Sequence, residues 1–152
     1  MSSELHDLYQ EVILDHNKRP RNFGTLEDAD RSAAGHNPLC GDRLTVHLKL
    51  DNDGVSEVSF EGSGCAISKA SASIMTDAVK GKSRDEIEHL FREFHTLLTG
   101  DPSVREKASA ELGKLAVFEG VREFPIRVKC ATLPWHTLKA ALDGRKDAAT
   151  TE

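Results

Sequence analysis

The sequence has little of what marks secreted, membrane-spanning or nucleic-acid-binding proteins. It contains only three cysteines, an odd number that does not favour a secreted disulfide framework. Acidic residues outnumber basic ones by 25 to 20, and no basic and aromatic stripe is available to neutralise phosphates. No apolar run approaches the length that spans a bilayer, and charges interrupt the N-terminal segment where a signal peptide would be apolar. We therefore expect a cytoplasmic protein that binds neither nucleic acid nor membrane.

Familiar catalytic motifs are also missing. The sequence has no G-x-S-x-G nucleophile elbow, no Walker A loop, no H-E-x-x-H motif and no H-x-E with P-C-x-x-C of zinc deaminases. Among the seven histidines, only His36, four residues before Cys40, is a reserve candidate for a ligand. This leaves the three cysteines, which are either free thiols, metal ligands or nucleophiles, or small buried hydrophobic residues.

Length and composition predict one domain over residues 1–152, with a flexible tail from about residue 145. With 38% hydrophobic and 30% charged residues, the chain resembles an ordinary globular protein with one core. Apolar residues at helical spacing predict a helix over residues 3–18. Alternating apolar and polar residues over 43–61, with a DNDG turn between them, predict a β-hairpin, and a short strand over 31–35 is weakly indicated.

The second half predicts mainly helices. Apolar periodicity and capping residues indicate successive helices from Cys65 to Gly81, from Ser83 to Gly100, and from Asp101 onwards. The second of these begins with a capping box, in which Ser83 and Glu86 are the partners. Residues 122–130 read as an extended approach to a final helix, so Cys130 would lie at a helix start. The order of elements predicts an α+β fold, with a small antiparallel β-sheet packed against several α-helices.

The segment HNPLCGDR places a thiol and a carboxylate two residues apart, directly before the hairpin. Residues i and i+2 of an extended segment point to the same side, so Cys40 and Asp42 can approach one ion while Gly41 allows a tight turn. Helix N-termini at Cys65 and Cys130 would favour thiolates. Three sulfurs and one carboxylate make a full tetrahedral set for Zn²⁺, but the spacing alone leaves buried, unliganded cysteines as an alternative.

Cations lie close to two of the cysteines in the sequence. A site of thiolates and a carboxylate carries net negative charge, which Arg127, Lys129 and Lys69 could offset, the alternative being a solvated face. The glycines of GSGC are expected to provide clearance for Cys65. Trp135 is either an anchor for a partner or a residue of helix packing.

Four segments together resemble the SufU proteins, the zinc-dependent sulfurtransferase branch of the superfamily that includes the IscU scaffold and the NifU N-terminal domain. They are LYQEVILDHNKRPRNFG, HNPLCGDRLTVHLKL, FEGSGCAISKASASIMTDAVKGKS and FPIRVKCATLPWHTLKAAL. IscU-type scaffolds carry a histidine directly before the third cysteine, whereas this chain has Lys129, whose ammonium cannot ligate a metal. The segment FHTLLTGDPSVREKASAELGKLAV also resembles the insertion that marks the SufU branch.

The resemblance implies an IscU/NifU N-terminal-like fold that binds a zinc ion. The implied ligands are Cys40, Asp42, Cys65 and Cys130. It also implies that Cys40 accepts persulfide sulfur from the PLP-dependent cysteine desulfurase SufS, after a desulfurase histidine has replaced it on the zinc. The sulfur would pass to the SUF machinery for iron–sulfur cluster assembly, with the SufBCD complex as downstream acceptor, and Arg127 could steer docking or stabilise the persulfide. The alternatives are an IscU-like scaffold that assembles an iron–sulfur cluster and a structural zinc site in an interaction module.

Overall fold

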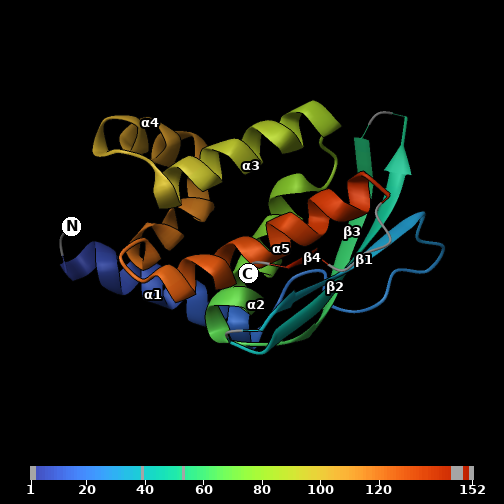
Figure 1. The fold of residues 1–152 in the computed structure, drawn as a ribbon, viewed down its shortest axis with the longest axis horizontal. Helices are drawn as coiled ribbons and strands as arrows, with labels where there is room; N and C mark the ends of the chain where they lie inside the picture. The colour runs from blue at the N-terminus through green and yellow to red at the C-terminus, as the bar shows by residue number, and fades with distance from the viewer. Residues whose placement is uncertain (1–2, 39, 53, 145–148, 151–152) are drawn as a thin grey trace.

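The fold is a small β-sheet with helices packed against one of its faces (Figure 1). The computed structural model describes residues 3–38, 40–52, 54–144 and 149–150. In chain order the elements are α1 (Ser3–Lys18), β1 (Arg31–Asn37), β2 (Asp42–Asp51), β3 (Gly54–Ser63), α2 (Ala66–Val79), α3 (Arg84–Thr99), α4 (Pro102–Leu112), the 3₁₀ segment η1 (Gly113–Val121), α5 (Pro125–Leu142) and β4 (Ala149–Thr150). The predicted α+β class is confirmed.

The sheet has the strand order β3-β2-β1-β4. Strand β2 pairs antiparallel with both β1 and β3, and the short β4 is parallel to β1. Successive side chains of a strand point to opposite faces, so Leu44, Val46 and Leu48 form one buried row that faces α2 and α5. Asp42 belongs to the same row, and Asn37 lies opposite it in β1. This register places two polar residues at the end of an otherwise apolar face.

Helices α2 and α5 form the centre of the core. The Ser71 hydroxyl of α2 donates a buried hydrogen bond to the Ala131 carbonyl of α5, 2.6 Å away. Trp135 of α5 is 1% exposed and stacks on Phe94 of α3, with the ring centroids 5.3 Å apart. Of the two readings of Trp135, the structure therefore supports helix packing and not an exposed anchor. Within the described residues, no helix is both long and apolar enough to cross a membrane.

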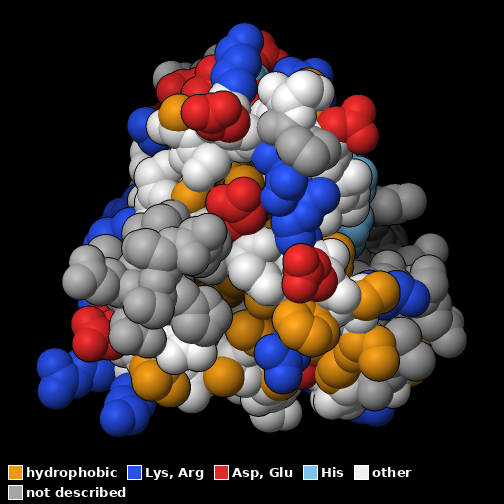
Figure 2. Space-filling view, turned by 90° about the vertical axis from the view of Figure 1, so that its left-hand side faces the viewer, with side chains coloured by type: hydrophobic (Ala, Val, Ile, Leu, Met, Phe, Trp, Pro, Cys, Tyr) orange, Lys and Arg blue, Asp and Glu red, His pale blue; other side chains and the backbone are white. Residues whose placement is uncertain are grey.

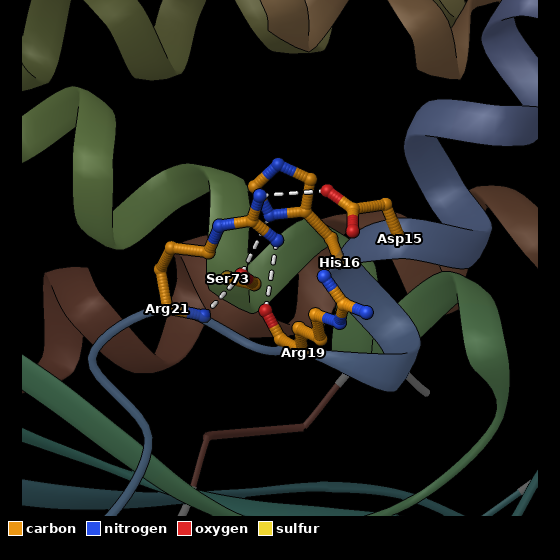
Figure 3. Close-up of polar contacts among 5 residues, drawn as sticks. All are labelled: Asp15, His16, Arg19, Arg21 and Ser73. Carbon is orange, nitrogen blue, oxygen red and sulfur yellow. Dashed lines mark hydrogen bonds and ion pairs between the residues drawn. The ribbon is translucent and has the colours of Figure 1, made fainter.

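Helix α1 is attached to α2 by a buried polar contact (Figure 3). His16 Nδ1 lies 2.7 Å from the Ser73 hydroxyl, which also accepts the Arg21 backbone N–H at 2.8 Å. The hydroxyl accepts from Arg21, so it can donate its own hydrogen to His16 Nδ1. Arg21 also pairs with Asp15 at 2.6 Å. Burial is the largest cause that lowers the pKa of His16, so the folded protein favours the neutral imidazole.

Most sequence-predicted elements of the first half and the middle are present. The helix over 3–18 and the hairpin are confirmed, and the weakly indicated strand over 31–35 extends to Asn37. Ser83 and Glu86 form the predicted capping box. Two residues of the expected tail, Ala149 and Thr150, instead form β4, and the rest of that tail lies outside the described residues.

The prediction for residues 122–130 is wrong. Helix α5 begins at Pro125, so Cys130 lies in its second turn and not at its start. A proline in the first turn is compatible with a helix because its missing N–H has no partner there in any case. Pro134 also lies inside α5, and an interior proline is unfavourable enough to suggest a helix that starts later. Cys65 therefore lies at a helix start as predicted, whereas Cys130 does not.

Candidate metal centre

Four predicted ligand residues come from four different parts of the fold. Cys40 lies in the turn between β1 and β2, and Asp42 is the first residue of β2. Cys65 caps α2, and Cys130 projects from the second turn of α5. The sulfurs of Cys40 and Cys130 and a carboxylate oxygen of Asp42 all lie within 4.8 Å of one another. The Cys65 sulfur is 3.9 Å from Asp42 Oδ2.

Asp42 forms the buried centre of this cluster. It is fully buried, and its Oδ1 accepts the Cys65 backbone N–H at 2.8 Å. A Cβ atom on Gly64 would come within 2.6 Å of the same Oδ1, so any larger residue at position 64 would clash with this carboxylate. We expected the GSGC glycines to give clearance to Cys65, whereas Gly64 gives it to Asp42.

The turn that carries Cys40 depends on Gly41. Gly41 has φ of 72°, in the left-handed region that glycine adopts most easily, and its N–H donates to the Asn37 carbonyl at 2.8 Å. The tight turn expected at Gly41 is therefore present. It brings the Cys40 sulfur to 3.1 Å from Cys130 Sγ, yet Cys40 is exposed to solvent whereas Cys130 is 1% exposed.

The three cysteines differ in their surroundings. Cys65 is the N-cap of α2, where its sulfur accepts the Ser68 N–H at 3.4 Å. Burial raises the pKa of the Cys130 thiol, and hydrogen bonds with Cys40, Asp42 and Cys65 raise it further. A buried cysteine of this kind becomes a thiolate at neutral pH when a bound cation compensates its charge.

This donor set fits Zn²⁺. With Zn–S distances of about 2.3 Å, ligand sulfurs of a tetrahedral site lie about 3.8 Å apart. The Cys40 and Cys130 sulfurs, 3.1 Å apart, are about 0.7 Å closer to each other than that value, so the fit rests on the chemistry of the donors and on their convergence. That Cys40, Asp42, Cys65 and Cys130 hold a metal stays a prediction.

Sequence reasoning missed Asn37. This residue is fully buried, and its side-chain amide lies 3.4 Å from Asp42 Oδ2 and 3.5 Å from Cys130 Sγ. An amide N–H can donate to a carboxylate or a thiolate, so Asn37 orients both neighbours. The signal was available in principle, since an asparagine shares the face of β1 with the buried residues Ala33 and Gly35.

The other residues singled out in the sequence do not contact the cluster. Within the part of the chain that the structure describes, no side-chain hydrogen bond or ion pair joins Arg127, Lys129 or Lys69 to its four members, although the Lys69 backbone N–H donates to the Cys65 carbonyl at 3.1 Å. The Arg127 guanidinium lies over the Phe124 ring at 5.0 Å, and the Lys69 ammonium over Phe23 at 5.3 Å. His36 is next to Asn37 in β1, so it points to the opposite face of the sheet.

An apolar groove lies beside the α2 and α5 ends that carry Cys65 and Cys130. It has a volume of about 560 Å³, and its lining includes Leu14, Ile67, Phe124 and Arg127. Leu14 and Phe124 are 51% and 49% exposed. Figure 2 shows hydrophobic side chains gathered with Lys and Arg on the lower half of the face at the α1 and α4 side.

Fold and site together define a small α+β protein with one exposed and two more buried thiols around a buried carboxylate. A sequence model of the NifU-like N terminal domain matches residues 8–131, so the chain belongs to this family. Over 138 residues it is 43% identical to the zinc-dependent sulfurtransferase SufU of Bacillus subtilis (strain 168), with 91% of each chain covered. The predicted resemblance to SufU is confirmed.

Scaffold proteins are about equally similar. The chain is 41% identical over 140 residues to the iron-sulfur cluster assembly scaffold protein IscU of Streptococcus pyogenes serotype M1, covering 92% of this chain and 86% of that protein. It also matches the crystal structure of a putative iron-sulfur cluster assembly scaffold protein for the SUF system from Fervidobacterium islandicum AW-1. That match has a TM-score of 0.78 and 36% identity, and covers 90% of this chain and 98% of the other.

Proposed function

We propose that this protein is a zinc-dependent sulfurtransferase of iron–sulfur cluster assembly. In this proposal Cys40 accepts sulfur from the persulfide of a PLP-dependent cysteine desulfurase, SufS, and passes it to the SUF machinery, with SufBCD as the downstream acceptor. One observation carries the assignment of Cys40. It is exposed, whereas Cys65 is half-buried and Cys130 is 1% exposed, so Cys40 is the sulfur that a large partner reaches most easily.

The residues that would hold the zinc are Cys40, Asp42, Cys65 and Cys130. When bound, zinc supplies positive charge that keeps the thiols deprotonated, and it has no redox chemistry that could oxidise them. The protein supplies the rest. The Cys65 N–H and the Asn37 amide fix the Asp42 carboxylate, and the Gly41 turn presents Cys40 at the surface.

The transfer is an exchange reaction that needs no external oxidant. The Cys40 thiolate attacks the terminal sulfur of the desulfurase persulfide, and a new S–S bond forms on Cys40. The S–S bond to the desulfurase cysteine breaks, and that cysteine leaves as a thiolate. Cys40 then carries the persulfide, and the same exchange repeated with an acceptor thiol regenerates it.

In this proposal Arg127 does not offset the negative charge of the cysteine cluster but contributes to docking of the partner. It lies over Phe124 in the lining of the apolar groove, not against the sulfurs. Exposed aromatic and arginine side chains are frequent energetic centres of interfaces. We therefore assign Arg127 to docking of the desulfurase beside the thiols.

A scaffold for cluster assembly is the second candidate, favoured by the 41% identity to the IscU protein of Streptococcus pyogenes. Against it, Lys129 precedes Cys130 in the chain, and a protonated lysine offers no lone pair to iron. Anaerobic reconstitution with iron and sulfide separates the two functions. A stable chromophore that transfers to an apo-acceptor without any need for zinc would favour the scaffold.

The test of the sulfurtransferase function uses the cognate desulfurase with cysteine as substrate. Alanine release should accelerate when the wild-type protein is added, and Cys40→Ala should abolish this acceleration. Arg127→Ala serves as a comparison: it should raise the concentration needed for half-maximal acceleration and leave the maximum in place. Acceleration by Cys40→Ala equal to that of the wild type would contradict the acceptor role.

A further inference from the structure

A second group of ligand-type side chains lies on α3 and α4, outside the cysteine cluster. His89 and Glu93 are four residues apart on α3 and therefore share one face of that helix. Helix α4 packs against α3 and contributes Glu111. The three residues each place one ligand atom within 4.8 Å of the other two. One imidazole and two carboxylates thus converge from two packed helices.

The spacing of these atoms matches a metal site. His89 Nε2 lies 3.2 Å from a carboxylate oxygen of Glu111. With metal–ligand distances of about 2.0–2.1 Å, two ligands of a tetrahedral zinc ion lie about 3.3 Å apart. The His89–Glu111 pair already has this separation. Bringing Glu93 to the same distance requires a movement of about 1.5 Å at most, within the reach of a side-chain rotation.

The group also places two carboxylates beside one imidazole. Glu93 and Glu111 bring two like charges together, which is unfavourable without a compensating group. Among the described residues, Glu111 forms an ion pair with His89 alone, and Glu93 forms none. His89 compensates only when it is protonated. A divalent ion would compensate both carboxylates and use the neutral imidazole as a ligand.

We propose that His89, Glu93 and Glu111 form a second zinc site, separate from the cysteine cluster. Its donors are the His89 Nε2 and one oxygen from each carboxylate, with water in the fourth position. Nitrogen and oxygen donors suit Zn²⁺ and neighbouring first-row ions such as Co²⁺ and Ni²⁺. Bound there, the ion joins α4 to α3. The proposal does not depend on the sulfurtransferase function.

Equilibrium dialysis against Zn²⁺ tests the site in full-length protein, with wild type compared with His89→Ala and Glu111→Gln. His95→Ala is the matched control, because His95 is an exposed histidine on the same helix that lies outside the group. Both changed ligands are exposed, so the variants should remain folded, and circular dichroism checks this. The measured quantity is the difference in bound zinc between wild type and each variant. Zinc on the cysteine cluster cancels in this difference because the cluster is the same in all of these proteins.

We expect wild type and His95→Ala to bind one more zinc per chain than His89→Ala, and Glu111→Gln to bind that zinc at least about tenfold more weakly. Loss of an outer partner of a ligand already costs about 10–100-fold in affinity, so loss of a ligand should cost no less. Equal zinc binding by wild type and His89→Ala would overturn the proposal. So would an equal loss in His95→Ala.

Discussion

The rim and the floor of the cysteine cluster are built differently. The rim is Cys40, exposed in a turn that depends on the positive φ of Gly41. The floor is Asp42, Cys130 and Asn37, all at most 1% exposed and held by hydrogen bonds from separate elements. Buried polar groups with fixed partners give a rigid base for a ligand set, whereas an exposed turn has fewer contacts to hold it. In the proposed function, the floor would hold the metal and the rim would exchange sulfur.

Loss of the floor carboxylate should have the largest effect. We expect Asp42→Ala to bind zinc at least about 100-fold more weakly, since it removes a predicted ligand and leaves the partly buried Cys65 N–H without its acceptor. Zinc analysis after dialysis measures this. Asp51→Ala is the control, because Asp51 is an exposed residue of the same strand, and this variant should keep its zinc. Full zinc in dialysed Asp42→Ala would remove the distinction between floor and rim.

Crowding of the floor should have the next largest effect. In Gly64→Ala the new Cβ would lie 2.6 Å from Asp42 Oδ1, so the carboxylate or the backbone must shift. Overpacking of this kind costs about 1–3 kcal/mol of folding free energy, and zinc binding should weaken with it. Gly120→Ala meets nothing within 4 Å and is the control. Chemical denaturation of both variants measures the difference, and equal midpoints would show that Asp42 does not need this clearance.

Removal of Asn37 tests the part of the floor that the sequence did not reveal. Asn37→Ala should weaken zinc binding by about 10–100-fold, as loss of an outer partner of metal ligands does. His36→Ala is the neighbouring change on the opposite face of β1, and it should leave zinc binding unchanged. If His36→Ala weakens zinc binding as much as Asn37→Ala does, then His36 also belongs to the site, contrary to this account.

The smallest effect is expected for the α1–α2 contact, which is not part of either region. Burial lowers the pKa of His16 in the folded state, so below pH of about 6.5 the unfolded chain binds more protons and the folded protein loses stability. His16→Gln should lose less stability between about pH 7.5 and 5.5 than wild type does, and should keep its zinc at neutral pH. Urea midpoints at both pH values measure this. Burial also lowers the pKa of His136, which acts equally in both proteins.

Local patterns predicted the elements, but they could not predict how the site is assembled. The alternation in β2 and the capping box at Ser83 involve only residues that are close in the sequence, and both predictions are confirmed. The start of α5 was missed because Phe124, Ile126 and Val128 alternate like a strand, although Ile126 is in fact exposed and helical. The contacts of Asn37 depend on the register of β1 with β2 and on the packing of α5, which join residues 93 positions apart.

The division between rim and floor is tested most directly by locating the transferred sulfur. Wild-type protein is mixed with desulfurase and cysteine, its free thiols are alkylated, and its peptides are analysed by mass spectrometry. The account predicts one additional sulfur atom on the Cys40 peptide and unmodified sulfurs at Cys65 and Cys130. Sulfur on Cys65 or Cys130 with none on Cys40 would contradict it.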